Sequence, residues 1–369
     1  MDLTTINDRI VSFLKFLYFG DSINIAVSNL CQLNCPICQI WRIREKVGSG
    51  YLKFKVFKKF VDAYPNFKNI EIAGLGEIFL NPELDSIIEY AYAKKINLTG
   101  LVGVNLNDVS EKTIEYLVRY QFKSLNVSID GASNNVYQIY RKGGDITKVI
   151  DNIKKINYYK CKYKTTYPEL GWQFIVFGHN EHELPAARKM AKELNMGFYP
   201  TFNSEPAYFP IKDKEFVRAQ MGFKSMEEWE DRQKYSWPKH YLAVCNQLLT
   251  HPQINWDGRL LGCTCNKVPF PANVFELGLE KAMKNESYVY AKKMLSGKVK
   301  GREDIPCFDC AAYKFRVAQK CYLSLAVRII HWPPSKIIIY KLFPKRFIAL
   351  LKFMLRNNLN LVLEWHLDR

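Results

Sequence analysis

Strand patterns and helix patterns alternate over the first 205 residues, and this alternation limits the fold more than any other feature. Short runs typical of strands recur six times, at residues 22–28, 69–73, 97–104, 124–129, 171–177 and 197–202. Helical patterns, with apolar residues three or four apart, lie between them, at residues 55–64, 81–91, 110–118, 145–158 and 181–195. The order predicts a parallel sheet with outer helices, curled into a partial (β/α)6 barrel. We expect its active site at the carboxyl ends of the strands.

Composition excludes several classes of protein. Of the 369 residues, 48% are hydrophobic, which excludes a disordered or collagen-like chain. No apolar run is long enough to span a membrane, and Asp2 and Asp8 make the first residues unlike a secretory signal. We therefore expect a cytoplasmic protein. The net charge of +17 indicates anionic partners.

The ten cysteines form two groups, separated by a long stretch that contains only Cys161. A chain of this length does not need disulfides to fold. Grouped cysteines in such a chain favour metal ligation in a reducing compartment.

The first group has the spacing C-x3-C-x2-C and follows the first strand: Cys31, Cys35 and Cys38. Three thiolates on a tight loop can bind three irons of a four-iron cluster, and the fourth iron is then open to a small molecule. The alternative is a zinc knuckle. Zinc sites usually need a fourth ligand nearby, and the loop contains no histidine.

With this loop and the strand ends that follow it, residues 22–205 resemble the radical S-adenosylmethionine (SAM) enzymes. The resemblance implies a [4Fe-4S] cluster on the three cysteines and SAM bound at its open iron. It also implies which residues contact SAM. These are Gly74, Gly76 and Glu77 at the amino group, Ser128 and Asp130 at the ribose, Arg141 at the carboxylate and Ile37 at the adenine.

The chain departs from the family pattern at one position, because Ile78 stands where a proline usually follows the glutamate. Asn180 and Glu183 resemble a segment common after the fifth strand in this group. Three residues that follow the sixth strand are candidate polar substrate contacts, on their loop position alone: Asn203, Glu205 and Tyr208. The scattered histidines and Trp41 are interpreted as packing or surface residues.

The second cysteine group resembles the auxiliary-cluster region of the SPASM and twitch subfamilies. Its proposed ligands are Cys245, the G-x4-C cysteine Cys263, and the C-x2-C pair Cys307 and Cys310. Residues 254–263 predict a hairpin turning at Asp257 and Gly258. Too few cysteines follow for the two-cluster SPASM pattern, which favours one auxiliary [4Fe-4S] cluster of the twitch type. A four-cysteine zinc site is the alternative.

Cys265 and Cys321 remain unassigned between buried thiols, alternative ligands and hydrogen-atom donors to a substrate radical. The sequence predicts five segments. They are an amphipathic helix (1–21), the partial barrel (22–205), a connector (206–240), the auxiliary-cluster domain (241–321) and a basic amphipathic tail (322–369).

The tail carries five apolar residues on one helical face: Phe347, Leu350, Leu351, Met354 and Leu355. Residues 336–369 have a net charge of +5. The tail is interpreted either as a helix docked on the protein's own core or as an interfacial helix on anionic lipid, which would add membrane association to the cytoplasmic expectation. No nucleic-acid-binding motif is present, so no nucleic acid is expected as a partner.

The architecture is similar to that of the aminocyclitol dehydrogenases. That resemblance implies hydrogen abstraction from a carbinol carbon of a carbohydrate-like or glycan-type substrate, followed by electron transfer to the auxiliary cluster. It implies a flavodoxin- or ferredoxin-type electron donor. The alternatives are an epimerase with a cysteine hydrogen donor, a peptide maturase, and a non-catalytic iron–sulfur scaffold.

Overall fold

The computed structural model describes residues 21–230, 245, 247–250, 252–263, 266–318, 320 and 322. The expected helix of residues 1–21 and the tail of residues 322–369 lie almost wholly outside this part. The chain divides into two compact units. One holds residues 23–231 and 254–258, and the second holds residues 1–22, 232–253 and 259–369.

A parallel sheet forms the centre of the first unit. Its strands lie side by side in chain order, and β2 to β6 pair in parallel. They are β1 (Ser22–Ile25), β2 (Asn69–Glu71), β3 (Asn97–Val104), β4 (Ser124–Ser128), β5 (Glu169–Val176) and β6 (Gly197–Phe202). The predicted α/β fold with a parallel sheet is confirmed.

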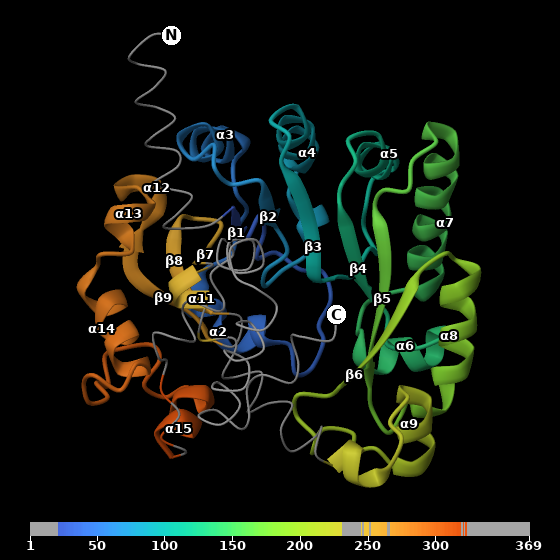
Figure 1. Cartoon of the computed structure of the whole chain (residues 1–369). Coiled ribbons are helices and arrows are strands. Elements are labelled where there is room, and N and C mark those ends of the chain that lie inside the picture. The colour runs from blue at the N-terminus through green and yellow to red at the C-terminus, as the bar shows by residue number, and fades with distance from the viewer. Residues whose placement is uncertain are drawn as a thin grey trace, which may run out of the picture. The chain divides into compact units, whose positions relative to one another are not determined.

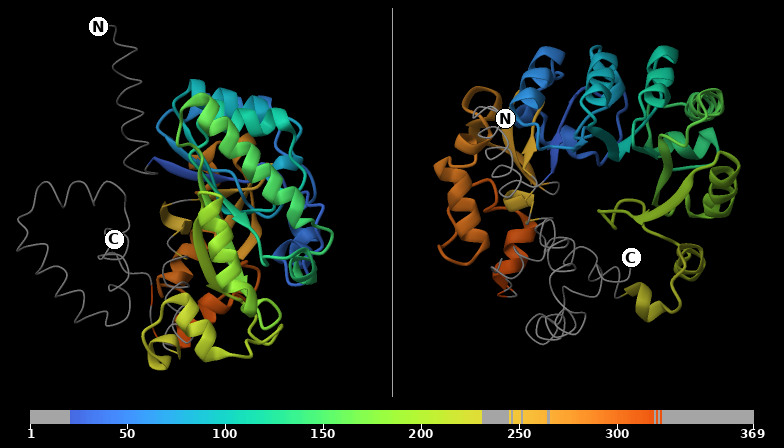
Figure 2. Two further views of the ribbon diagram at one scale, coloured as in Figure 1. Left: turned by 90° about the vertical axis from the view of Figure 1, so that its right-hand side faces the viewer. Right: turned by 45° about the horizontal axis from the view of Figure 1, so that its top comes forward.

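Helices cover the outer side of these strands, as Figures 1 and 2 show for α3, α4, α5, α7 and α8. Each turns its apolar face inward; in α5, Ile114, Leu117 and Val118 are buried and the Ser110 side chain caps the first turn. The helices of this unit are α2 (Gln39–Val47), α3 (Phe54–Ala63), α4 (Leu84–Ala93), α5 (Glu111–Arg119), α6 (Asn134–Tyr140), α7 (Ile146–Tyr163), α8 (Leu184–Glu193) and α9 (Lys214–Met221). The sequence patterns did not predict α2, α6 or α9.

The helix expected over residues 81–91 begins later than predicted, because α4 starts at Leu84. The Asn81 side chain donates to the Val27 and Leu52 carbonyls, both over 3.0 Å, and accepts from the Glu83 N–H. Asn81 therefore ties the chain after β2 to the chain after β1.

The second unit is built on an antiparallel pair, β8 (Arg259–Cys263) and β9 (Asn266–Asn273). Its buried centre includes Phe270 and Tyr288, whose rings lie 4.9 Å apart. The Tyr288 hydroxyl donates to the Leu248 carbonyl. Its helices are α11 (Gln247–Thr250), α12 (Val274–Leu277), α13 (Leu279–Ala282), α14 (Glu286–Leu295) and α15 (Ala311–Ala318).

Residues 254–258 belong to the first unit although the sequence assigned them to the auxiliary-cluster segment. Strand β7 (Gln253–Ile254) reaches β1, where the Ala26 N–H donates to the Ile254 carbonyl over 2.9 Å. Asn29 Nδ2 donates to Asn255 Oδ1 over 3.0 Å, and Asn255 Nδ2 donates to the Val47 carbonyl. The first unit is thus assembled from two separate stretches of chain.

Within the described residues, no helix combines the length and apolar character that a membrane crossing needs.

Candidate functional site

The three cysteines of the first group lie on the loop between β1 and α2. Cys35 is buried, Cys31 and Cys38 are half-buried, and all three are free thiols. They pack in one apolar cluster with Leu33 and Tyr140. Loss of hydration raises the pKa of Cys31 to about 12 and also raises that of Cys35. Thiols in this position become thiolate ligands only when a bound positive charge compensates the loss of water.

The turn after β2, residues 74–77, contacts the chain directly before Cys31. The Glu77 N–H donates to the Leu30 carbonyl over 2.7 Å. A Cβ atom on Gly76 would lie 2.5 Å from that same oxygen, and one on Gly74 would lie 2.8 Å from the Ala26 Cβ. The two glycines therefore allow a backbone approach that a side chain would block.

The Glu77 carboxylate is buried beneath the turn and holds the end of β3. Its oxygens accept from the Asn105 N–H over 2.6 Å and from the Phe79 N–H over 3.3 Å. Burial raises the pKa of Glu77 to about 7, against the stabilising effect of these N–H groups. Glu77 also interacts electrostatically with Cys31. The structure thus brings Glu77 to the cysteine loop, where its carboxylate binds backbone groups.

Asp130 and Arg141 form a buried ion pair at the end of β4. Arg141 Nε donates to Asp130 Oδ2 over 2.6 Å, and the Ile175 N–H donates to Asp130 Oδ1 over 2.6 Å. Arg141 Nη1 lies 3.8 Å from Cys35 Sγ. The carboxylate raises the pKa of Arg141 and keeps the guanidinium charged beside the cysteine loop. Asp130 is fully buried and acts on the loop through Arg141.

Ser128 and Ile37 also reach this end of the sheet. The Ser128 hydroxyl donates to Gln173 Oε1 over 3.4 Å. Both atoms lie close to Gly103, because a Cβ atom added to Gly103 would lie 2.6 Å from Ser128 Oγ. Ile37 is half-buried in the apolar cluster that contains the cysteines.

Asn180 and Glu183 fix the loops behind the site. Asn180 Nδ2 donates to the Asp130 and Ile175 carbonyls, so it joins the ends of β4 and β5. Glu183 accepts from the Ala132 N–H over 2.6 Å and from the Ser133 hydroxyl. Both side chains bind the protein's own loops.

The loop after β6 reaches α2. Asn203 Nδ2 donates to the Glu205 and Tyr208 carbonyls and shapes this loop. The Glu205 carboxylate pairs with Arg42 of α2 at 2.5 Å. Tyr208 packs in the apolar cluster that contains Cys35. Of the three candidate substrate contacts, Glu205 and Tyr208 thus border the cysteine loop.

His179 lies among aromatic rings, stacked on Phe177 at 5.2 Å and edge-on to Phe209 at 4.7 Å. His182 is exposed, as is Trp41, under the Arg44 guanidinium. His251 lies outside the described residues.

The four proposed auxiliary ligands of the second cysteine group lie in the second unit. Cys245, Cys263 and Cys307 are buried, and Cys245, Cys307 and Cys310 are near enough to interact electrostatically. Cys263 pairs in β8–β9 with Asn266, whose side-chain amide donates to the Pro306 carbonyl, next to Cys307. Cys265 and Cys321 lie outside the described residues.

Two residues near the cysteines were not singled out from the sequence. Asn105 Nδ2 lies 3.8 Å from Cys31 Sγ. It directly follows β3, so its place at a strand end was the signal that could have found it. Arg316 of α15 is buried and forms a side-chain hydrogen bond with the Cys245 thiol. Nothing in the sequence marks Arg316 apart from its distance of two helical turns from Cys310.

Both groups fit an iron–sulfur cluster in the number and kind of their donors. Within the described stretches, no three His, Cys, Asp or Glu side chains form the group that a single metal ion would need. In a four-iron cluster each thiolate binds its own iron, so the ligands surround a larger group than one ion.

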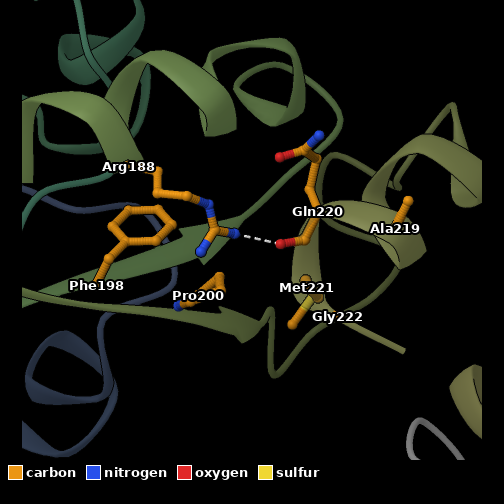
Figure 3. Close-up of a pocket in the computed structure, with 7 residues that line it drawn as sticks. All are labelled: Arg188, Phe198, Pro200, Ala219, Gln220, Met221 and Gly222. Atoms are coloured by element: carbon orange, nitrogen blue, oxygen red, sulfur yellow. Dashed lines mark hydrogen bonds between the residues drawn. The ribbon is translucent and has the colours of Figure 1, made fainter. Parts of the chain in front are cut away.

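A separate cavity of about 380 Å³ lies between α8, β6 and α9 and is shown in Figure 3. The Arg188 guanidinium lies 5.0 Å from the Phe198 ring centre and donates to the Gln220 carbonyl. Its only ionisable lining group is therefore already engaged, and no cysteine lines it.

The family model of the Radical SAM superfamily matches residues 25–189. A 7,8-dihydro-6-hydroxymethylpterin dimethyltransferase of Methanocaldococcus jannaschii is 28% identical over 199 residues, which are 50% of this chain and 36% of that protein. A probable GTP 3′,8-cyclase of the same organism is 29% identical over 145 residues, 36% of this chain and 44% of that protein. The chain thus spans less than half the length of these two relatives.

Among solved structures, that of Streptococcus suis SuiB bound to S-adenosylmethionine superimposes with a TM-score of 0.56. The match covers 88% of this chain and 78% of that one at 16% identity. At this identity the likeness concerns the fold alone.

Proposed function

We propose that the chain is an enzyme that binds SAM at a [4Fe-4S] cluster on Cys31, Cys35 and Cys38, because residues 25–189, which match the Radical SAM family model, contain these three cysteines. When bound at these cysteines, the cluster and SAM would supply a 5′-deoxyadenosyl radical able to remove a hydrogen atom from a substrate C–H bond. The protein's own part is to bind, orient and shield these groups.

One observation carries this proposal: a charged arginine and a buried carboxylate both reach the cysteine loop. Arg141 lies beside Cys35 and Glu77 interacts with Cys31. The methionine part of SAM carries a positive amino group and a negative carboxylate, and each is bound best by a group of the opposite charge. We propose that Arg141 binds the SAM carboxylate and that the turn from Gly74 to Glu77 receives its amino group.

The Glu77 carboxylate contributes to this site in two ways. It has about four lone-pair positions, of which backbone N–H groups fill only some. Because it is 1% exposed, we assign it first to holding the turn against β3 and only through that to the SAM amino group. Ser128 is the proposed ribose contact, Asp130 supports Arg141, and Ile37 offers apolar surface to the adenine.

We further propose that the reaction is an oxidation and that the second cysteine group binds an auxiliary [4Fe-4S] cluster. A substrate radical at a carbinol carbon that loses one electron and one proton becomes a ketone. An auxiliary cluster supplies the acceptor for that electron. The buried thiols Cys245, Cys263 and Cys307, with Cys310, are its proposed ligands.

The inner face of the sheet supports a carbohydrate-like substrate. Leu125, Val127 and Trp172 are fully buried, and the residues that alternate with them along the strands face the opposite side of the sheet. There, a Cβ on Gly171 would lie 2.2 Å from Asn126 Oδ1 and 2.9 Å from the Tyr199 ring. An uncharged amide beside an aromatic ring suits an uncharged molecule rich in hydroxyl groups.

The decisive experiment is anaerobic incubation of reconstituted protein with SAM and a strong reductant. We expect 5′-deoxyadenosine from the wild type and none after Cys31, Cys35 and Cys38 are changed to Ala. Full-length protein that holds four irons on these cysteines yet never cleaves SAM would contradict the proposal.

A second arm tests the substrate face. Tyr199 is 53% exposed, so Tyr199→Ala should keep SAM cleavage and lower its coupling to product. Tyr158→Ala, on an exposed residue of α7, is the matched control.

A further inference from the structure

Arg316 is an arginine inside the second unit, next to the auxiliary cysteines. It lies on α15, which begins directly after Cys310, and its relative exposure is 2%. Its side chain forms a hydrogen bond with the Cys245 thiol and interacts with it electrostatically. Cys245 in turn interacts with Cys307 and Cys310.

A buried guanidinium keeps its charge, because arginine does not lose its proton in proteins. Placing such a charge in the interior is costly unless negative charge lies close to it. As ligands of an iron–sulfur cluster, Cys245 and Cys307 would be thiolates, and the cluster with its ligands would be anionic. The arginine and a bound cluster therefore balance each other's charge.

We propose that Arg316 is a positioning residue that raises the reduction potential of the auxiliary cluster and thereby makes it an electron acceptor. This inference rests on the proposed function of the second cysteine group. Net charge and hydrogen bonds to the sulfurs are two of the properties that set the potential of such clusters. Arg316 supplies both at Cys245, and each favours the form that holds one more electron.

The arginine near the first cysteine group stands in a different electrostatic setting. Arg141 also approaches a cysteine sulfur, but the Asp130 carboxylate at 2.6 Å balances its charge. Its effect on a cluster at Cys31, Cys35 and Cys38 is therefore reduced by a neighbouring negative charge. The first cluster must give an electron to SAM and the auxiliary cluster must take one from the substrate radical, so a higher potential at the second suits the proposed direction of transfer.

The test is a redox titration of full-length reconstituted protein, followed by electron paramagnetic resonance. Added SAM changes the signal of the cluster to which it binds, which identifies the other signal as auxiliary. Arg316→Met should lower the auxiliary midpoint potential by about 59 mV, a tenfold change in the one-electron equilibrium. Arg316→Lys should keep it near the wild-type value because the charge remains.

Lys314→Met is the matched control. Lys314 lies on the same helix, but it is exposed and pairs with Asp309 at 3.3 Å. Its replacement should leave the auxiliary potential unchanged.

An unchanged midpoint potential in Arg316→Met, with wild-type iron content, would overturn the inference. Arg316→Gln provides a second neutral variant that keeps polar character. Loss of the auxiliary iron in both neutral variants but not in Arg316→Lys would support the charge balance, and loss in all three would overturn it. Wild-type protein with bound zinc in place of the auxiliary iron would instead refute the proposed function of this site.

Discussion

The Arg141 guanidinium donates a hydrogen bond to the Asp130 carboxylate over 2.6 Å, from the loop after α6 to the end of β4. Asp130 is fully buried and also accepts a hydrogen bond from the Ile175 N–H. Its carboxylate is therefore held in place and can orient the Arg141 side chain. The residue that we propose to bind the SAM carboxylate is thus held by a direct hydrogen bond to Asp130.

Asp130→Asn should weaken SAM binding by about 10- to 150-fold, the equivalent of a charge-assisted hydrogen bond of roughly 1.5–3 kcal/mol. The neutral amide no longer holds Arg141 in place. Equilibrium binding of SAM to the reconstituted protein measures the effect, and Lys142→Ala, on the exposed neighbour, is the control. Equal SAM affinity in Asp130→Asn and the wild type would show that Arg141 does not bind SAM.

Iron content separates the two cysteine groups. Anaerobically reconstituted protein should hold about eight irons as two four-iron clusters. Changing Cys31, Cys35 and Cys38 together to Ala should leave about half of this iron. Metal analysis that finds tightly bound zinc with only one cluster would exclude the auxiliary [4Fe-4S] site.

The fate of the substrate radical distinguishes oxidation from epimerisation. In an oxidation no thiol donates hydrogen, so Cys265→Ala and Cys321→Ala should keep full activity. In an epimerase one of these cysteines returns a hydrogen atom, and turnover in deuterated water places deuterium on carbon. Loss of product in either variant, with 5′-deoxyadenosine still formed and both clusters loaded, would favour the epimerase.

His179 should make the stability of the protein depend on pH. Burial lowers the pKa of His179 from its ordinary 6.5 to about 4, and His182 and Lys212 add to this effect. The unfolded chain therefore binds a proton that the folded chain does not, and the free energy of unfolding falls as the pH drops from 6.5 to about 4.

Denaturant unfolding at several pH values checks this. His179→Phe keeps an aromatic ring between Phe177 and Phe209 and should be less sensitive to acid than the wild type. His182→Asn, on an exposed residue, should retain the wild-type dependence. An identical acid response in His179→Phe and the wild type would show that folding does not lower the pKa of His179.

The basic tail is tested with lipid vesicles. If residues 336–369 form an interfacial helix, the full chain should float with anionic vesicles and dissociate at high salt. A chain ending at Ser335 should stay soluble and not bind. An insoluble truncation, together with no vesicle binding by the full chain, would identify the tail as docked on the protein.

The sequence predicted the sheet well because short strand patterns alternate with helices whose apolar residues recur every three or four positions. The helical patterns of residues 110–118 and 145–158 were both found, and in the structure the Ser110 and Asp145 side chains cap α5 and α7. The short helix α2 was missed because its buried residues, Ile40 and Val47, are too few to form an apolar stripe.

The environment of the site residues was much harder to predict than their positions. The spacing of Cys31, Cys35 and Cys38 marks a cluster loop, and the sequence led to it directly. That Asp130 supports Arg141 depends on a contact between residues 11 positions apart across a loop, which no periodic pattern encodes. Arg316 was missed because burial of a charged residue follows from tertiary packing, and helix composition alone gives no sign of it.

The hydrogen bond from Asn29 to Asn255 joins residues 226 positions apart. At the usual speed of translation, about 5–20 residues per second, the ribosome needs roughly 10 to 45 seconds to make the stretch between them. Throughout that interval Asn29, at the start of the cysteine loop, lacks its hydrogen-bond partner Asn255. Insertion of iron and sulfur into the first group is therefore expected to follow the synthesis of Asn255, when most of the chain has already left the ribosome.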